Sequence, residues 1–233
     1  MNSLLEVRGV SKIYKHNKMA LNNFSINLEG GQIVGLLGPN GSGKSTLIKM
    51  INGLLVPNSG MIYVDGKPVG IDTKKIISYL PERTYFDKQQ TVKELLSYFA
   101  DFYEDFDMKK AEAMLADLGV NQNAKMKELS KGTQEKVQLV LVMSRKALLY
   151  ILDEPIGGVD PAARDYILNT ILKNYNPNGL VLISTHLISD VENTLDRVIF
   201  IKNGELILNE NADDLRVQRR NSVDEIFREV FAC

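Results

Sequence analysis

The sequence reads Ile-Val-Gly-Leu-Leu over residues 33–37 and continues Gly-Pro-Asn-Gly-Ser-Gly-Lys-Ser-Thr over residues 38–46. The first run is apolar like a buried strand, and the second matches G-x-x-x-x-G-K-[ST] at the start of a helical pattern. In that context backbone N–H groups turn toward a polyphosphate, Lys44 reaches its outer phosphates, and Ser45 offers a hydroxyl to magnesium. The stretch therefore predicts a nucleotide site, rather than an accidental Gly-rich turn, formed by Gly38, Pro39, Asn40, Gly41, Ser42, Gly43, Lys44, Ser45 and Thr46.

A second apolar run ends in two carboxylates. Leu-Leu-Tyr-Ile-Leu over residues 148–152 is followed by Asp153 and Glu154. At a strand end Asp153 is placed to hold the magnesium shell, and Glu154 to accept a proton from water attacking the terminal phosphate. Acidic residues after a strand are often turn formers only. A separate phosphate-binding loop in the same chain favours the catalytic interpretation.

Strand-like and helix-like patterns alternate along the chain. Apolar runs at residues 33–37, 148–152 and 180–184 are typical of buried parallel strands, and helical periodicity covers residues 44–54, 130–145 and 161–175. This alternation predicts a doubly wound α/β sheet. Strand-like alternation at residues 4–10, 21–28 and 61–64 predicts a small antiparallel sheet, and residues 91–120 are helical throughout. A hairpin is expected around Asn203-Gly204, and one or two short helices from Ala212 to Val230.

Composition limits the classes of function. The 233 residues are 44% hydrophobic and 24% charged, which suffices for a compact core in one large domain. The 28 basic and 29 acidic residues give a net charge of −1, so we expect no nucleic-acid partner. The basic run of Arg216, Arg219 and Arg220 is typical of a solvated helix face.

Cysteine content and hydropathy bear on location. The single cysteine, Cys233, cannot form an internal disulfide, which favours the cytosol. Met1 to Val10 carry Glu6 and Arg8 and do not look like a secretion signal. No stretch approaches the roughly 18 apolar residues that span a bilayer. We therefore expect a cytoplasmic protein, and any action at a membrane would have to go through another chain.

Further motifs carry a family resemblance. Leu-Ser-Lys-Gly-Thr-Gln over residues 129–134 precedes a long helical pattern and resembles the signature motif of ATP-binding-cassette (ABC) proteins. Residues 154–161, with Asp160, resemble the D-loop that follows the two carboxylates, and Ser-Thr-His over residues 184–186 resembles the segment with the switch histidine, His186. Tyr14 matches the aromatic residue that stacks on adenine. Taken alone, the signature segment would be read as an ordinary helix start, the histidine as a surface residue and the tyrosine as core.

The resemblance extends over about Leu4 to Glu210 and implies both fold and organisation. It implies a phosphate-loop NTPase fold of the ABC ATPase type: a mainly parallel α/β core sheet, an N-terminal antiparallel β subdomain and an inserted α-helical subdomain. One domain would cover residues 1–233, with the helical insert at about 84–146 and a short helical tail at about 211–233.

The resemblance also implies a function. The chain is expected to bind and hydrolyse ATP with Mg²⁺, to dimerise head to tail with a second ABC ATPase subunit, and to drive an integral membrane permease that docks near Thr84 to Phe86. Ser130, Lys131 and Gly132 would contact ATP held by the opposite subunit, Glu154 and His186 would be catalytic, and Ser45, Glu82 and Asp153 would serve the metal. Similarity is greatest to the export-associated branch that includes bacitracin-resistance ATPases.

Two residues depart from the commonest pattern of the family. Glu82 stands where a glutamine usually contacts magnesium and the attacking water, and Lys131 replaces a glycine of the signature motif. Glu82 still offers oxygen to magnesium but adds negative charge near the triphosphate. Lys131 either attracts a γ-phosphate or points into solvent.

Two alternatives remain from the sequence. A soluble, non-transport ABC ATPase of translation or DNA repair would carry two cassettes or a long coiled-coil insert, and neither is present. A weakly hydrolytic regulatory subunit is suggested by Glu82 and Lys131, but Lys44, Asp153, Glu154 and His186 are all present and complete the minimum for hydrolysis.

Overall fold

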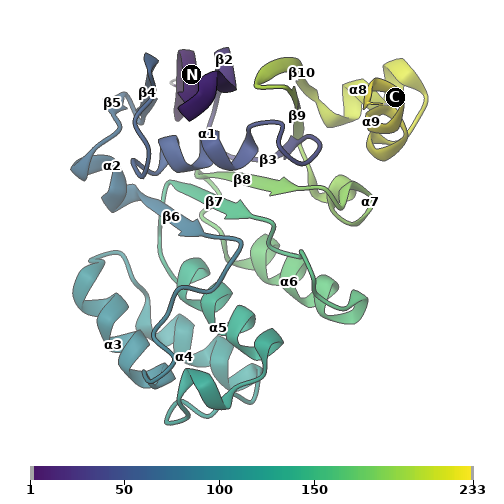
Figure 1. Cartoon of the computed structure of the whole chain (residues 1–233). Coiled ribbons are helices and arrows are strands. Elements are labelled where there is room, and N and C mark those ends of the chain that lie inside the picture. The colour runs from purple at the N-terminus through teal and green to yellow at the C-terminus, as the bar shows by residue number, and fades with distance from the viewer. Residues whose placement is uncertain (1–2, 232–233) are drawn as a thin grey trace.

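The computed structural model describes residues 3–231 and contains two sheets. The larger sheet has six strands in the order β10-β9-β3-β8-β7-β6, all parallel except β10, which pairs antiparallel with β9. The smaller sheet is antiparallel with the order β2-β1-β4-β5. Figure 1 shows α1 between the two sheets and helices α3 to α6 on the opposite side of the larger one.

The helices and strands have the following bounds. The strands are β1 (Leu5–Tyr14), β2 (Lys18–Leu28), β3 (Gln32–Leu37), β4 (Ser59–Val64), β5 (Lys67–Pro68), β6 (Ile77–Leu80), β7 (Leu149–Asp153), β8 (Leu180–Thr185), β9 (Arg197–Lys202) and β10 (Glu205–Asn211). The α-helices are α1 (Lys44–Ile51), α2 (Ile71–Ile76), α3 (Val92–Phe102), α4 (Met108–Asp117), α5 (Lys131–Met143), α6 (Pro161–Asn174), α7 (Ile188–Val191), α8 (Ala212–Arg219) and α9 (Val223–Phe231). Short 3₁₀ helices are η1 (Lys15–Asn17), η2 (Met126–Glu128) and η3 (Glu192–Thr194).

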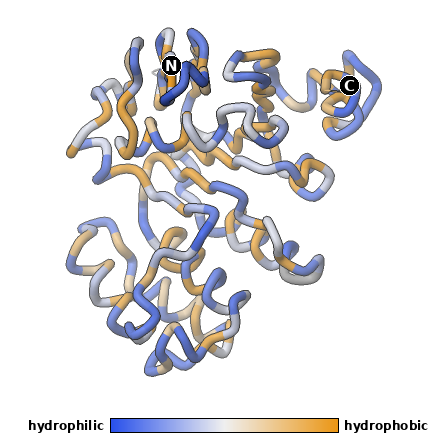
Figure 2. The backbone as a smooth tube through the Cα atoms, viewed as in Figure 1, coloured by the Kyte–Doolittle hydropathy of each residue, from blue (hydrophilic) through white to orange (hydrophobic). Residues whose placement is uncertain are grey.

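The larger sheet is covered on both faces, which explains its nearly continuous apolar strands. One face packs with α1 and the small sheet around Val34, Leu36 and Ile151, all fully buried. The other packs with α3 to α6, α8 and α9 around Tyr150, Leu152 and other buried side chains. Figure 2 shows the hydrophobic segments concentrated in these central strands. The α/β fold with a mainly parallel core, an antiparallel β part and an inserted helical part is as predicted.

The structure differs from the local predictions at several places. Strand β6 was not predicted, although it forms the edge of the larger sheet beside β7. Residues 91–120, predicted to be helical throughout, form α3 and α4 with a short non-helical segment between them, and Asp107 begins α4 by accepting a hydrogen bond from the Lys110 backbone N–H. Helix α5 ends at Met143, two residues before the predicted end at Arg145. Arg145 lies beyond the helix, and its guanidinium donates to the carbonyl oxygens of Lys75 and Ile77.

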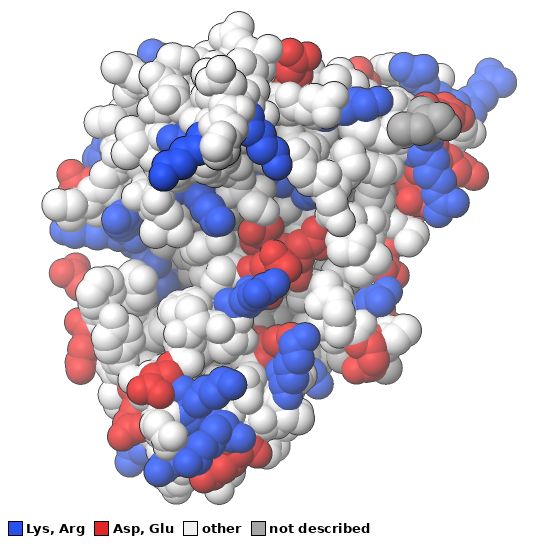
Figure 3. Space-filling model, in the orientation of Figure 1, with Lys and Arg blue, Asp and Glu red and all other residues white. Residues whose placement is uncertain are grey.

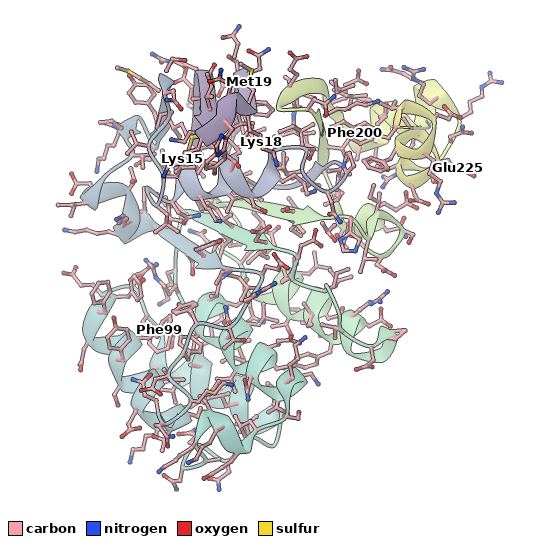
Figure 4. The ribbon with its side chains drawn as sticks, in the orientation of Figure 1. Lys15, Lys18, Met19, Phe99, Phe200 and Glu225 are labelled. Atoms are coloured by element: carbon pink, nitrogen blue, oxygen red, sulfur yellow. The ribbon has the colours of Figure 1, made fainter. Side chains whose placement is uncertain are left out.

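The C-terminal helices complete the described chain. Phe227 and Phe231 of α9 pack on Phe200 of β9, with ring centroids 5.4 and 5.8 Å from it. Figure 4 labels Phe200 beside these helices. Cys233 lies outside the described residues, so the prediction that it forms no internal disulfide stays a prediction. Among residues 3–231, no helix is long and apolar enough to span a membrane.

Candidate functional site

The phosphate-binding loop lies between β3 and α1, and its glycines are required by close backbone contacts. A Cβ on Gly38 would lie 2.3 Å from the Ile201 carbonyl oxygen, and one on Gly43 would lie 2.5 Å from the Ala20 carbonyl oxygen. Gly43 also has a φ of 114°, in the left-handed region that disfavours other residues. These contacts seat the loop against the β2 and β9 segments, so that the N-terminus of α1 opens into the site.

Lys44 occupies the centre of the loop. Its Nζ donates to the carbonyl oxygens of Gly38 at 2.6 Å and Pro39 at 3.3 Å. Burial lowers the pKa of Lys44, while the nearby Glu154 and Asp153 carboxylates oppose that change. The Ser42 hydroxyl is buried and has no hydrogen-bond partner among residues 3–231. A buried ammonium and an unpaired hydroxyl inside a glycine loop fit a bound polyphosphate, whose oxygens would accept from both.

The carboxyl ends of β3, β7 and β8 meet beside this loop. Asp153 of β7 pairs in register with Ser184 of β8, and Thr185 pairs with Leu37 of β3. Parallel strands thus bring the phosphate loop, the two carboxylates and the histidine segment to one edge of the sheet. Asp153 is buried, and burial raises its pKa, with smaller contributions from neighbouring carboxylates.

Glu154 is held by two side chains that follow β8. His186 Nδ1 lies 3.0 Å from Glu154 Oε2, and the Thr185 hydroxyl donates to the same oxygen at 3.1 Å. Glu154 has a φ of 52°, and its backbone N–H donates to the Ser184 carbonyl oxygen. The left-handed turn directs its carboxylate toward His186. The sequence placed Glu154 and His186 in the site but gave no signal for their direct contact or for Thr185.

A groove of about 1000 Å³ runs along this edge; we call it the nucleotide groove. Its lining includes most of the predicted site residues: Tyr14, Asn40, Gly41, Ser42, Gly43, Lys44, Ser45, Thr46, Glu82, Lys131, Glu154 and His186. Lys18 and Met19 also line it, and they lie with Lys15 at the end of the β1–β2 hairpin (Figure 4). The groove is large enough for a nucleotide.

The aromatic end of the groove is formed by Tyr14, the last residue of β1. Its ring is 40% exposed, and its hydroxyl lies 3.4 Å from the Thr46 hydroxyl. Lys12 Nζ lies 5.9 Å from the ring centroid. Because the Tyr14 hydroxyl is close to Thr46, the last residue of the phosphate-binding motif, the ring lies near the phosphate loop. A nucleotide whose base stacks on Tyr14 could therefore place its phosphates in that loop.

The three predicted metal ligands, Ser45, Glu82 and Asp153, do not all line the same cavity. Ser45 and Glu82 line the nucleotide groove, whereas Asp153 lines a smaller cavity beside it together with Glu82. Among residues 3–231, no group of three or more His, Cys, Asp and Glu side chains is arranged to hold a metal. Magnesium prefers few protein ligands plus phosphate oxygens, so this donor set fits a metal that arrives with a nucleotide.

The segment that resembles a signature motif begins α5. The Ser130 hydroxyl caps the helix by accepting from the Thr133 N–H at 3.2 Å. Apart from its chain neighbours and the backbone of its own helix, no atom of the described residues lies within 4 Å of the position of a Cβ on Gly132, and Ser130, Lys131 and Gly132 are all exposed. The predicted D-loop residue Asp160 is exposed immediately before α6. The open end of α5 is therefore free to meet a ligand or a second subunit.

A second groove, of about 730 Å³, lies between α2, β6 and α3; we call it the apolar groove. Its lining exposes Leu54, Ile71, Tyr85 and Phe102 by 60–81%. Lys74, Lys75 and Arg83 add positive charge. Figure 4 labels Phe99, which also lines this groove from α3. Of the predicted docking segment Thr84 to Phe86, Tyr85 lines this groove; the other lining residues come from separate segments that the sequence did not bring together.

Comparisons with known proteins agree with this geometry. Residues 21–157 match the family model described as ABC transporter. The chain is 32% identical over 210 residues to the SkfA peptide export ATP-binding protein SkfE of Bacillus subtilis, covering 88% of this chain and 87% of that protein. It is 34% identical over 213 residues to the linearmycin resistance ATP-binding protein LnrL of the same organism, covering 88% and 68%.

Among solved structures, one described as the ATP binding subunit of an ABC transporter superposes with a TM-score of 0.86 at 30% identity, covering 98% of this chain and 99% of that one. Its fold therefore matches this chain almost end to end. The chain belongs to the ABC transporter family and is the ATP-binding subunit of such a transporter.

Proposed function

We propose that the chain hydrolyses ATP with Mg²⁺ and uses the cycle to drive a membrane permease, in the direction of export. The main support for this proposal is that Lys44, Glu154 and His186 all line the nucleotide groove. The names of two relatives, SkfE and LnrL, refer to SkfA peptide export and to linearmycin resistance, and these support export. We place the protein in the cytoplasm, on the inner face of the membrane through the permease.

In this proposal Lys44 and the loop N–H groups bind the phosphates, and Tyr14 stacks on adenine. Magnesium, held by Ser45, Asp153 and Glu82, neutralises phosphate charge when bound. Glu154 Oε2 accepts the proton of the attacking water. His186, 3.0 Å from that oxygen, orients the carboxylate.

Two subunits would close around ATP. The exposed N-terminus of α5, with Ser130 and Gly132, is suited to donate to the γ-phosphate held by the opposite subunit. Asp160 is exposed and follows Gly157 and Gly158, which line the groove, and it would face the partner subunit. ATP then favours the closed dimer, and hydrolysis removes the contacts that hold it closed. Helices α3 to α5 would act as one inserted unit of a single domain.

The apolar groove is the proposed docking site of the permease. Its exposed aromatic and aliphatic side chains fit the apolar face of a short amphipathic helix, and Lys74, Lys75 and Arg83 favour carboxylates on that helix. Arg83 lines both grooves, so docking and nucleotide binding share a residue.

Affinity isolation of the tagged protein from detergent-solubilised membranes, followed by mass spectrometry, tests the proposal. We expect a polytopic membrane protein in the eluate, together with ATP hydrolysis by the isolated complex. Recovery of ribosomes, nucleic acid or soluble partners alone would contradict the transport function and favour the non-transport ABC ATPases. A stable membrane complex without turnover would favour the regulatory subunit.

A further inference from the structure

Thr185 is the last residue of β8 and contacts the Glu154 carboxylate from inside the fold. Its side chain is fully buried, and it pairs in register with Leu37 at the carboxyl end of β3. Glu154 lines the nucleotide groove, whereas Thr185 does not. Thr185 is therefore placed to act on a bound nucleotide through another residue and not by direct contact.

The hydroxyl of Thr185 has a defined direction. It accepts a hydrogen bond from the Leu187 backbone N–H at 3.1 Å, and it lies 3.1 Å from Glu154 Oε2. A hydroxyl carries one proton, and an ionised carboxylate only accepts. Because the Leu187 N–H can only donate, the proton of Thr185 is directed at Glu154. The branched side chain of threonine has few rotamers, which keeps the hydroxyl in this position.

The main chain of Glu154 is held by the same strand end. Its backbone N–H donates to the Ser184 carbonyl oxygen at 2.8 Å. Asp153, the residue before it, pairs in register with Ser184. Ser184 and Thr185 are consecutive residues of β8. The end of β8 therefore positions both the backbone and the side chain of Glu154.

His186 contacts the same carboxylate oxygen but is less confined. Its Nδ1 lies 3.0 Å from Glu154 Oε2, and its side chain is 53% exposed. A carboxylate oxygen offers about two lone-pair sites. One site can stay with the buried Thr185 hydroxyl while the other passes from His186 to the attacking water. Thr185 is then the contact that still holds the carboxylate when the proton is transferred.

Charge alone does not fix the direction of the carboxylate. Glu82, Glu135 and Glu154 line the nucleotide groove together with Lys44. Figure 3 shows acidic side chains gathered near the middle of this face of the molecule, with basic side chains beside them. Coulomb forces depend on distance, whereas a hydrogen bond also depends on angle. A directed donor such as the Thr185 hydroxyl is therefore needed to set the orientation.

We propose that Thr185 is a positioning residue for hydrolysis: its hydroxyl donates to Glu154 Oε2 and holds the carboxylate toward the attacking water. The inference rests on the proposed function, in which Glu154 is the base. A catalytic base is commonly oriented by a third group. Loss of that orientation slows the reaction without weakening binding, so ATP affinity should not depend on the Thr185 hydroxyl.

Steady-state ATP hydrolysis by Thr185→Val tests the inference, because valine keeps the branched shape and removes the hydroxyl. We expect kcat to fall about 10-fold, since a misplaced base loses part of the roughly 10²- to 10⁴-fold contribution of general-base catalysis. The KM for ATP, and the Kd of a non-hydrolysable ATP analogue with magnesium, should change less than about twofold. Thr185→Ser restores a hydroxyl and should bring kcat back to within about threefold of the wild-type value.

Thr73→Val is the matched control. Thr73 is also fully buried, and its hydroxyl accepts from the Gly70 N–H at 3.0 Å, but it lies on α2 and does not line the nucleotide groove. Thr73→Val should lower stability without changing kcat. Thermal unfolding of both valine variants separates a loss of stability from a loss of turnover.

The effect of Thr185→Val must also depend on Glu154. In a Glu154→Gln background the side chain cannot accept the proton of water, so adding Thr185→Val should change the residual turnover by less than about twofold. A similar loss in both backgrounds would show that Thr185 acts elsewhere, for example through the Leu187 N–H that valine leaves unpaired. That result would overturn the inference.

Two further results would also overturn it: an unchanged kcat in Thr185→Val, or equal losses of kcat and of affinity for the analogue. Either result leaves the proposed function intact, provided that the wild-type protein hydrolyses ATP and Glu154→Gln does not. A wild-type protein without turnover would contradict the proposed function itself, and the inference with it.

Discussion

The nucleotide groove and the apolar groove share Arg83 but are built in different ways. The nucleotide groove is formed largely by backbone, with glycines where a Cβ would collide and charged groups at strand ends. The apolar groove is formed by side chains that are exposed by more than half, such as Ile71 and Phe102. Backbone geometry fixes the shape of a site before its ligand binds. Exposed apolar side chains contribute favourable free energy only when a partner buries them.

The largest expected effect concerns the nucleotide groove. Lys44→Ala removes the ammonium at the centre of the phosphate loop, and we expect ATP affinity to fall more than about 100-fold, since charged hydrogen bonds contribute roughly 1.5–3 kcal/mol each. Calorimetry measures it. Lys15→Ala on the β1–β2 hairpin, which does not line the groove, is the control. Unchanged affinity in Lys44→Ala would show that the loop is not the phosphate site.

A smaller effect is expected at the apolar groove. Ile71→Ser and Phe102→Ser should each weaken the affinity for the permease about 30-fold, which corresponds to an interface hot spot of roughly 2 kcal/mol. Less permease should then be recovered with each variant. ATP binding by the isolated protein should not change, because neither residue lines the nucleotide groove. Quantitative affinity isolation measures the loss.

Val217→Ser on α8 is the matched control for Ile71→Ser. The two side chains are similar and nearly equally exposed, at 77% and 81%, but Val217 is outside the apolar groove. If Val217→Ser and Ile71→Ser reduced permease recovery equally, the apolar groove would not be the docking site. The proposed division of roles between the two grooves would then be wrong.

The smallest effect is structural and confined to the helical insert. Asp107 caps α4, which packs on α3 and α5, and Asp107→Ala should lower the free energy of unfolding by about 1 kcal/mol. Asp107→Asn keeps a capping oxygen and should lose less. Chemical denaturation at neutral pH measures both. A loss of ATP affinity in Asp107→Ala would show that the nucleotide groove depends on the insert more than this account allows.

The cap also predicts a pH dependence. The hydrogen bond from the Lys110 backbone N–H lowers the pKa of Asp107 below its ordinary value of 3.8. A lowered folded-state pKa means that the stabilisation is present above the unfolded pKa and is lost as pH falls through the folded one. The difference between wild type and Asp107→Ala should therefore shrink below about pH 4. A difference that stays constant there would contradict a charged cap.

Sequence patterns predicted the backbone-built part of the molecule well and the rest poorly. The loop at residues 38–46, the strand before Asp153 and the Ser130 cap each depend on neighbours in the chain, so a local pattern specifies them. Strand β6 was missed because its four residues, Ile77–Leu80, are too few for a clear period. The roles of the individual site residues stay predictions.

Long-range packing accounts for what could not be predicted. The buried Arg145 joins the core to the helical insert through the carbonyls of Lys75 and Ile77 and through Asp105. These partners lie 40 to 70 residues away in sequence, and no local pattern pairs them. The apolar groove, whose lining includes Arg145, has the same origin.

The mass of Glu154→Gln in solution tests the central claim most directly. Glutamine cannot accept the proton of the attacking water, whereas Lys44 and the phosphate loop remain. Light scattering after gel filtration should show a monomer without nucleotide or with ADP, and a dimer with ATP and Mg²⁺, while turnover falls at least about 100-fold, as expected for loss of a general base. A Glu154→Gln protein that hydrolyses ATP at the wild-type rate, or that remains monomeric with ATP, would contradict ATP-driven closure with Glu154 as the base.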